Sequence, residues 1–218
     1  MADTLQKEGW IHVIFGITGG IATGKSTVSD MLRARGAVIV DADFWAREVV
    51  KPGSEGWEAI RQQFGEEYLR PDGSLDREKL GALVFADEAA RKRLNAITHP
   101  LIRQKMDEQV RQALSDDPKA IVVMDIPLLI ESMVHEGLKR VDKVILVYVP
   151  RHIQLQRLMK RNQLNRQEAE NRIEAQMPID EKRKYADYII DNSGSIEETE
   201  RQVEQLMDKL RKLVQGER

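Results

Sequence analysis

Short runs rich in valine and isoleucine alternate along the chain with longer segments whose apolar residues recur at helical spacing. The runs cover residues 11–18, 37–41, 120–125, 143–149 and 188–191. A near-continuous apolar run of four to eight residues is typical of a strand buried on both faces of a parallel sheet. The pattern therefore predicts an α/β fold, with a parallel five-stranded sheet as the middle of three layers.

Helices are expected between these strands, beginning and ending at recognisable residues. Residues 25–35 form a predicted helix that ends near Gly36, and residues 100–114 form another, with Pro100 in its first turn and His99 as its cap. The pairs Asn165 with Glu168 and Ser195 with Glu198 have the spacing of capping boxes.

Two segments interrupt the alternation and divide the chain. Residues 43–114 hold several helical stretches and no convincing strand, with Asp76 and Asp87 as expected caps, so they predict a helical insertion. Residues 151–186 form a second, basic helical excursion. The α/β core is then expected to consist of residues 11–42, 115–150 and 187–218.

Composition narrows the class of protein. With 41% hydrophobic and 32% charged residues in 218, the chain is expected to be a globular protein with a substantial core. It has no apolar run of about 18 to 20 residues and no secretory signal pattern, so we expect a cytoplasmic protein without membrane contact. The absence of cysteine excludes disulfides, thiolate metal sites and a cysteine nucleophile.

Charge is nearly balanced overall but not locally. The 34 basic and 36 acidic residues give a net charge of −2, which argues against general binding of nucleic acid. Residues 151–184 alone have a net charge of +4. This segment is either a solvated helical face or, if the protein binds phosphate elsewhere, part of that site.

The sharpest motif lies between the first predicted strand and the first predicted helix. Residues 19–26 read Gly-Gly-Ile-Ala-Thr-Gly-Lys-Ser and fit the P-loop pattern G-x-x-x-x-G-K-[ST]. Its backbone N–H groups are expected to cradle phosphates, with Lys25 on the β- and γ-phosphates and Ser26 on Mg²⁺. The alternative is a structural glycine turn. GTPase signatures are poor, because Asn-Lys-x-Asp is absent and Asp191-x-x-Gly194 comes too late in the chain.

Acidic residues end two of the predicted strands, where a parallel sheet forms its ligand crevice. Asp41 and Asp43 follow the second strand and would face the same way if that strand continued; one of them could then accept a proton from an attacking hydroxyl. Otherwise both cap the next helix. The third strand ends in Asp125 and resembles a Walker B strand, whose acid would hold Mg²⁺ through water.

The basic excursion carries arginines at helical spacing. Arg157 and Arg161 lie four residues apart, and Arg172 and Gln176 repeat that spacing on the next predicted helix. A mobile basic hairpin that closes over a triphosphate would exclude water and stabilise the charge of the transferring group.

Taken together, the motifs resemble the dephospho-CoA kinase family over nearly the whole chain. The resemblance depends on the order and spacing of six segments, which are residues 18–26, 41–50, 98–103, 125–131, 156–161 and 186–194. It implies a P-loop core, a helical CoA-binding domain and a lid. It also implies transfer of the γ-phosphate of ATP to the 3′-hydroxyl of dephospho-CoA.

The resemblance assigns roles to single residues. Ala22, Thr23, Gly24, Lys25, Ser26 and Thr27 would line the phosphates of ATP together with Arg161. Asp43 would act as base or orienter of the hydroxyl, Arg157 would lead the lid, and Ser26 and Asp125 would serve Mg²⁺. The acceptor side would be formed by Asp41, Arg47, His99, Arg103, Pro127 and Leu128.

Alternatives remain for these assignments. His99 can simply cap the helix at Pro100, and Pro127 can simply shape its loop. Ala22 and Thr23 differ from the Gly and Ser of many relatives, and Trp45 replaces a commoner aliphatic residue. Another P-loop small-molecule or nucleoside monophosphate kinase is the nearest alternative function, and a nucleotide-binding regulatory module is an alternative of a different class.

Overall fold

The computed structural model describes residues 12–137 and 139–216, which divide into two compact units. Unit 1 consists of Met1–Val40 and Gln112–Arg218, and unit 2 of Asp41–Arg111. Within the described residues, no helix combines the length and the apolar composition that crossing a membrane would need. Residue 11 and the N-terminal extension lie outside the described part.

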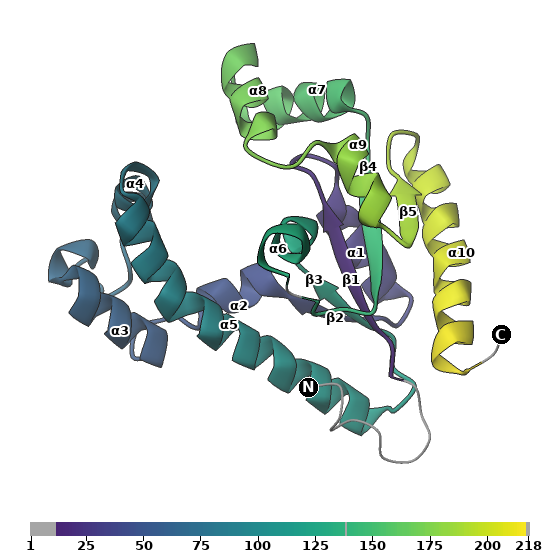
Figure 1. Ribbon diagram of the computed structural model, residues 1–218, viewed down its shortest axis with the longest axis horizontal. Coiled ribbons are helices and arrows are strands. Elements are labelled where there is room, and N and C mark those ends of the chain that lie inside the picture. Colours follow the sequence, from purple (N-terminus) through teal and green to yellow (C-terminus); the bar gives the residue numbers. More distant parts are fainter. Residues whose placement is uncertain (1–11, 138, 217–218) are drawn as a thin grey trace. The chain divides into compact units, whose positions relative to one another are not determined.

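Unit 1 is built on the predicted sheet of five strands, in the order β2-β3-β1-β4-β5 (Figure 1). The strands are β1 (Ile14–Gly19), β2 (Val38–Asp41), β3 (Val122–Asp125), β4 (Lys143–Tyr148) and β5 (Tyr188–Asp191). β1 pairs in parallel with β3 and β4, and β4 with β5. The predicted parallel α/β class is confirmed; β5 has the expected bounds, and no strand end differs from its expected residue by more than three.

Helices cover both faces of the sheet. Phe15 and Ile17 of β1 belong to a buried cluster that includes residues of α1 (Lys25–Ala34) and α10 (Ile196–Val214). Gly16 lies between them and faces the other way, because side chains alternate along a strand. A methyl group there would meet Leu129, the first residue of α6 (Leu129–Glu136), 2.5 Å away. The strand thus has a helix packed on each side, which is the expected three-layer arrangement.

Local sequence signals explain where several helices begin. Both capping boxes are present, Asn165–Glu168 at α8 (Arg166–Glu174) and Ser195–Glu198 at α10. α7 (Arg151–Asn162) follows Pro150, and the short α9 (Ile179–Lys182) follows Pro178. Figure 1 shows α7 and α8 side by side, and their apolar faces pack together through Leu155, Leu158, Ala169 and Ile173.

Unit 2 is helical, as expected from its sequence. It contains α2 (Ala42–Glu48), α3 (Glu55–Phe64), α4 (Arg77–Ala86) and most of α5 (Glu88–Asp116), around a core that includes Ile60, Phe64 and Leu80. Asp76 caps α4, and Asp87 accepts hydrogen bonds from the N–H groups of Ala89 and Ala90.

The predicted helix start at Pro100 is wrong. α5 runs from Glu88 to Asp116 with Pro100 in its interior, so His99 is an interior helical residue and caps nothing. A proline in the interior of a helix costs about 3 kcal/mol relative to alanine, which is why the sequence indicated a helix boundary at this residue. Apolar residues on both sides of it, among them Ile97 and Leu101, pack on the unit 2 core and hold the helix together.

Candidate active site

The P-loop lies where the sequence placed it, between β1 and α1. Its backbone curls through two residues with positive φ, Ala22 at 61° and Gly24 at 84°. A positive φ costs alanine more than it costs glycine, so the backbone at Ala22 is strained. The buried Thr23 closes the loop, since its hydroxyl donates to the Gly20 carbonyl at 2.9 Å.

A cavity of about 730 Å³ opens beside this loop. It is lined by Ala22, Gly24, Ser26, Thr27, Arg157, Lys160, Arg161, Asn192, Gly194 and Ile196. The structure therefore brings together the predicted phosphate-binding residues of the P-loop and the two lid arginines. The volume lies within the range of small-molecule sites.

Four of the lining residues were not assigned to the site from the sequence. Lys160 lies between the two arginines on α7, and Asn192, Gly194 and Ile196 follow β5. A signal for the last three was available, because they follow a strand whose carboxyl end is part of the ligand edge of the sheet.

Asn192 connects the parts of the cavity wall. Its buried side chain donates to the Thr23 carbonyl at 2.8 Å and accepts from the Thr199 hydroxyl at 3.0 Å. Its own carbonyl accepts a hydrogen bond from the Arg157 guanidinium at 2.8 Å. One residue thus holds both the P-loop and the lid arginine, and a methyl group on Gly24 would collide with its amide.

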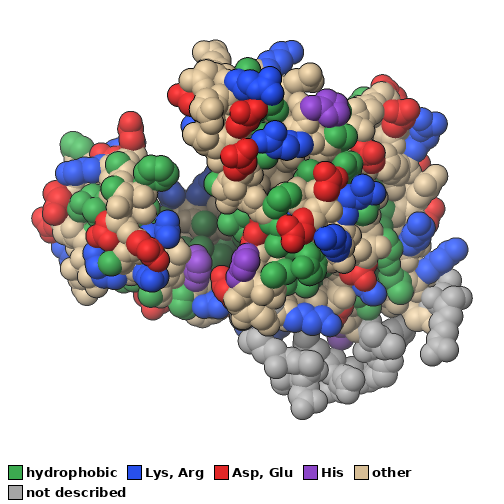
Figure 2. Space-filling view, turned by 45° about the horizontal axis from the view of Figure 1, so that its top comes forward, with side chains coloured by type: hydrophobic (Ala, Val, Ile, Leu, Met, Phe, Trp, Pro, Cys, Tyr) green, Lys and Arg blue, Asp and Glu red, His purple; other side chains and the backbone are tan. Residues whose placement is uncertain are grey.

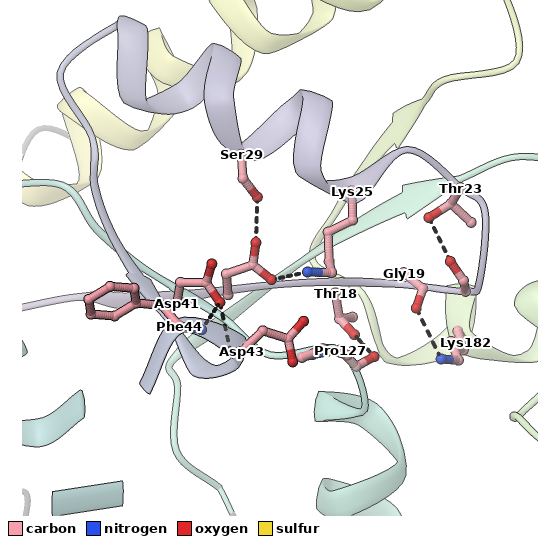
Figure 3. A network of polar contacts seen from close by, with 12 residues as sticks. Thr18, Gly19, Thr23, Lys25, Ser29, Asp41, Asp43, Phe44, Pro127 and Lys182 are labelled. Atoms are coloured by element: carbon pink, nitrogen blue, oxygen red, sulfur yellow. Dashed lines mark hydrogen bonds and ion pairs between the residues drawn. The ribbon is translucent and has the colours of Figure 1, made fainter. Parts of the chain in front are cut away.

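Lys25 points to the end of β3. Its ammonium forms an ion pair with the buried carboxylate of Asp125, whose other oxygen accepts from the Ser29 hydroxyl at 2.7 Å (Figure 3). Both oxygens of the Walker B-like acid are therefore engaged by residues of α1. The predicted closeness of Asp125 to the P-loop is present in the structure.

The loop after β3 carries the expected Pro127 and Leu128. The Pro127 carbonyl accepts a hydrogen bond from the Thr18 hydroxyl at 2.9 Å, which ties this loop to the end of β1 (Figure 3). Leu128 is 46% exposed and immediately precedes α6. An exposed leucine next to a fixed loop is available for contact with a ligand.

The expected alternation of Asp41 and Asp43 does not apply, because β2 ends at Asp41 and a helix follows. The Asp41 carboxylate caps α2 by accepting from the N–H groups of Asp43 and Phe44, at 2.8 and 3.1 Å. Of the two alternatives predicted from the sequence, capping of the next helix is therefore the one present for Asp41. Asp43 lies in the first turn of α2 with an exposed side chain and caps nothing in the described structure.

The other acceptor-side residues lie in unit 2. Arg47 is in the last turn of α2, and His99 and Arg103 lie four residues apart on α5, which places them on one helix face. Arg47, His99 and Arg103 are all exposed. They are polar surface residues of the helical unit, separate in the chain from the P-loop.

The basic excursion is a helical hairpin fixed at its base. Arg157 is half-buried against Asn192, whereas Arg161 is exposed and donates to Asn162 at 2.8 Å. Over the coloured part of the visible face, Lys and Arg side chains alternate with Asp and Glu, so this view shows no continuous basic surface (Figure 2). The basic side chains in the cavity wall are Arg157, Lys160 and Arg161.

Comparison with known proteins shows the family to which the chain is similar. The sequence profile of the family described as dephospho-CoA kinase matches residues 13–198. A dephospho-CoA kinase from Bacillus licheniformis is 51% identical over 197 residues, which are 90% of this chain and 96% of that protein. One from Geobacillus kaustophilus is 52% identical over 189 residues, 86% of this chain and 92% of that protein.

Solved structures agree with the sequence comparison. A crystal structure of a Thermus thermophilus protein aligns with a TM-score of 0.75 and 37% identity, covering 91% of this chain and 97% of that one. A dephospho-CoA kinase from Campylobacter jejuni aligns with a TM-score of 0.67 and 32% identity, covering 93% and 98%.

Proposed function

The chain belongs to the dephospho-CoA kinase family, and we propose that it transfers the γ-phosphoryl group of ATP to the 3′-hydroxyl of dephospho-CoA. Kinase activity is common to the family. The observation that carries the assignment of the site is the single cavity that contains the P-loop, Arg157 and Arg161. The expected cytoplasmic location stays a prediction.

ATP binds in this cavity with its phosphates at the start of α1. The N–H groups of residues 22–27 and the positive end of the helix dipole face the phosphate oxygens. Lys25 contacts the β- and γ-phosphates, which requires its ammonium to share or leave the Asp125 carboxylate. Ile196, 48% exposed in the cavity wall, offers an apolar surface for the adenine ring of ATP.

The lid arginines act on the transferring group. Phosphoryl transfer spreads negative charge over the equatorial oxygens of the γ-phosphorus, and guanidinium groups stabilise that charge where water is excluded. Arg157 is held in the cavity wall by the Asn192 carbonyl, so it is oriented before ATP arrives. Arg161 is exposed and is recruited when the hairpin closes.

Asp43 is the proposed base. It is exposed and caps nothing in the described structure, so its carboxylate is available to accept the proton of the 3′-hydroxyl. The hydroxyl oxygen forms the new bond to the γ-phosphorus as the bond to the β,γ-bridging oxygen breaks. ADP leaves, and CoA carries the phosphate.

The acceptor is held by residues outside the cavity. Arg47, His99 and Arg103 supply cationic and polar groups for the phosphates of dephospho-CoA, and Pro127 and Leu128 supply an apolar contact. Asp41 acts indirectly, because its carboxylate fixes the first turn of the helix that carries Asp43.

The residues present fit Mg²⁺. Mg²⁺ prefers water and phosphate oxygens to a protein cage, so one or two oxygen ligands from the protein are enough to hold it beside ATP. Ser26 would supply a direct oxygen ligand, and Asp125, whose oxygens are already engaged, would act through water. When bound, the ion neutralises charge on the β- and γ-phosphates.

The test is a transfer assay followed by mass spectrometry. The protein receives ATP and Mg²⁺ with dephospho-CoA, and in parallel with nucleoside monophosphates and small alcohols. A mass gain of one phosphate on dephospho-CoA alone is the expected result. Phosphate on another acceptor would overturn the substrate assignment, and nucleotide binding without transfer would favour the regulatory module.

A further inference from the structure

A lysine outside the ATP cavity is completely buried beside the P-loop. Lys182, the last residue of α9, has no solvent exposure. A lysine is almost never fully buried without a partner, because its ammonium loses its hydration. The interactions that hold it there therefore need an explanation.

Lys182 joins three segments of unit 1. Its ammonium forms an ion pair with Glu131 of α6 at 2.7 Å and lies 3.4 Å from the carbonyl of Gly19, where β1 enters the P-loop (Figure 3). The same Glu131 oxygen accepts from the N–H of Met177, in the segment between α8 and α9, at 3.3 Å. The pair thus links the start of the P-loop to the end of the α7–α8 hairpin.

Two glutamines reinforce the same connection. The Ile21 N–H donates to the Gln176 side chain at 2.8 Å, and the Ile21 carbonyl accepts from the Gln154 side chain at 2.9 Å. Gln176 directly precedes Met177 in the chain. The P-loop is therefore held at Gly19 and Ile21 by residues of the basic excursion.

Stability alone is a poor reason for such an ion pair. Removing two charges from water costs several kcal/mol each, and well-packed apolar residues of similar volume often do as well or better. The other oxygen of Glu131, Oε2, is buried without a hydrogen-bond partner among the described residues, which adds to the cost. What the pair supplies is a fixed geometry between the elements it joins.

We propose that Lys182 and Glu131 are positioning residues for phosphoryl transfer, which set the P-loop and the base of the lid relative to each other. The proposal rests on the proposed function, since its readout is transfer. Neither residue lines the ATP cavity. Their effect is on the alignment of the groups that do, where a displacement of about 1 Å can cost about a hundredfold in rate.

The experiment compares three variants with the wild-type chain. Lys182→Met combined with Glu131→Leu replaces the ion pair by apolar side chains, so that no buried charge is left alone. Glu131→Gln keeps the shape and removes the charge, and Lys182→Arg keeps charge and donors. Lys143→Met is the matched control, because it breaks a different lysine–carboxylate ion pair of unit 1, Lys143–Asp187 at 2.8 Å, at the opposite end of the sheet.

Each protein is measured for kcat and KM of transfer, for ATP hydrolysis without acceptor, and for its thermal midpoint. We expect the double variant and Glu131→Gln to lose about tenfold or more in kcat, with a raised ratio of hydrolysis to transfer. Lys182→Arg should restore most of the turnover, and Lys143→Met should have the wild-type ratio.

The outcomes separate the two proposals. If the wild type transfers phosphate and either folded Glu131→Gln or the folded double variant has an unchanged kcat, the positioning role alone is overturned. A loss in Lys182→Arg as large as in the double variant also overturns it. Absence of transfer in the wild type overturns the proposed function.

Discussion

Replacing Lys25 with methionine is expected to lower the free energy of unfolding of the nucleotide-free protein as well as to stop transfer. Its ammonium neutralises Asp125, which is 4% exposed, and the remaining hydrogen bond of that carboxylate comes from Ser29. Removing one member of a buried ion pair costs about 3–5 kcal/mol, because it leaves an unpaired charge. The Lys25 side chain is 19% exposed, so we expect the lower end, about 3 kcal/mol.

A second substitution tests this reasoning. Lys25→Met combined with Asp125→Asn removes the stranded charge while the asparagine oxygen still accepts from the Ser29 hydroxyl. The double variant should therefore recover all but about 1 kcal/mol, the usual worth of a neutral hydrogen bond. Both variants should be nearly inactive, because both lack the phosphate-binding ammonium.

The assay is urea unfolding followed by circular dichroism without nucleotide, with the slope m compared between variants. Lys143→Met is the control, since its more exposed ion pair should contribute less than about 1 kcal/mol. A loss below about 1 kcal/mol in Lys25→Met would refute the reasoning. So would a double variant as unstable as the single one at unchanged m.

Three further results are expected. Asp43→Asn should lower kcat by about 10² to 10⁴ with ATP affinity retained, because the acceptor proton loses its base; a change in KM alone would move Asp43 to binding. Arg157→Ala should slow the chemical step in single-turnover kinetics more than it weakens acceptor binding, and an unchanged step would contradict this. Burial raises the pKa of the Asp187 carboxyl, but hydrogen bonds from Lys143 and the Val144 N–H outweigh it and leave the pKa below the ordinary 3.8. A lowered pKa stabilises the fold above pH 3.8, so the stability difference between wild type and Asp187→Asn should shrink as urea midpoints are measured down to about pH 3; a difference independent of pH would contradict the assignment.

The features that could be predicted are those that neighbouring residues determine. The buried strands are continuous apolar runs, the P-loop is one contiguous motif, and the caps at Asp76, Asn165 and Ser195 depend on a partner three residues away. Such features depend on residues that are close together in the sequence, so they can be recognised without knowing which distant residues are in contact.

The features that escaped prediction depend on contacts across the chain. Residues 180–184 are all charged, and Lys182 lies in their middle, so the segment has the sequence pattern of a solvated surface. Its burial follows from Glu131, which is 51 residues away in the sequence. In the same way, the position of Asn192 between Thr23 and Arg157 follows from the fold of unit 1.

Pro100 lies inside α5 although proline disfavours the interior of a helix, and replacing it tests what the residue contributes. Its ring cannot supply the N–H that would bond to the Ala96 carbonyl, and the residue is exposed, so packing does not repay the loss. Pro100→Ala should therefore raise the free energy of unfolding by up to about 3 kcal/mol. If the proline shapes the turn that presents His99 and Arg103, the same variant should raise the KM for dephospho-CoA while leaving the KM for ATP unchanged. Urea unfolding and steady-state kinetics measure both quantities. Lower stability would show that the helix needs the proline, and an unchanged KM would show that the turn plays no part in binding the acceptor.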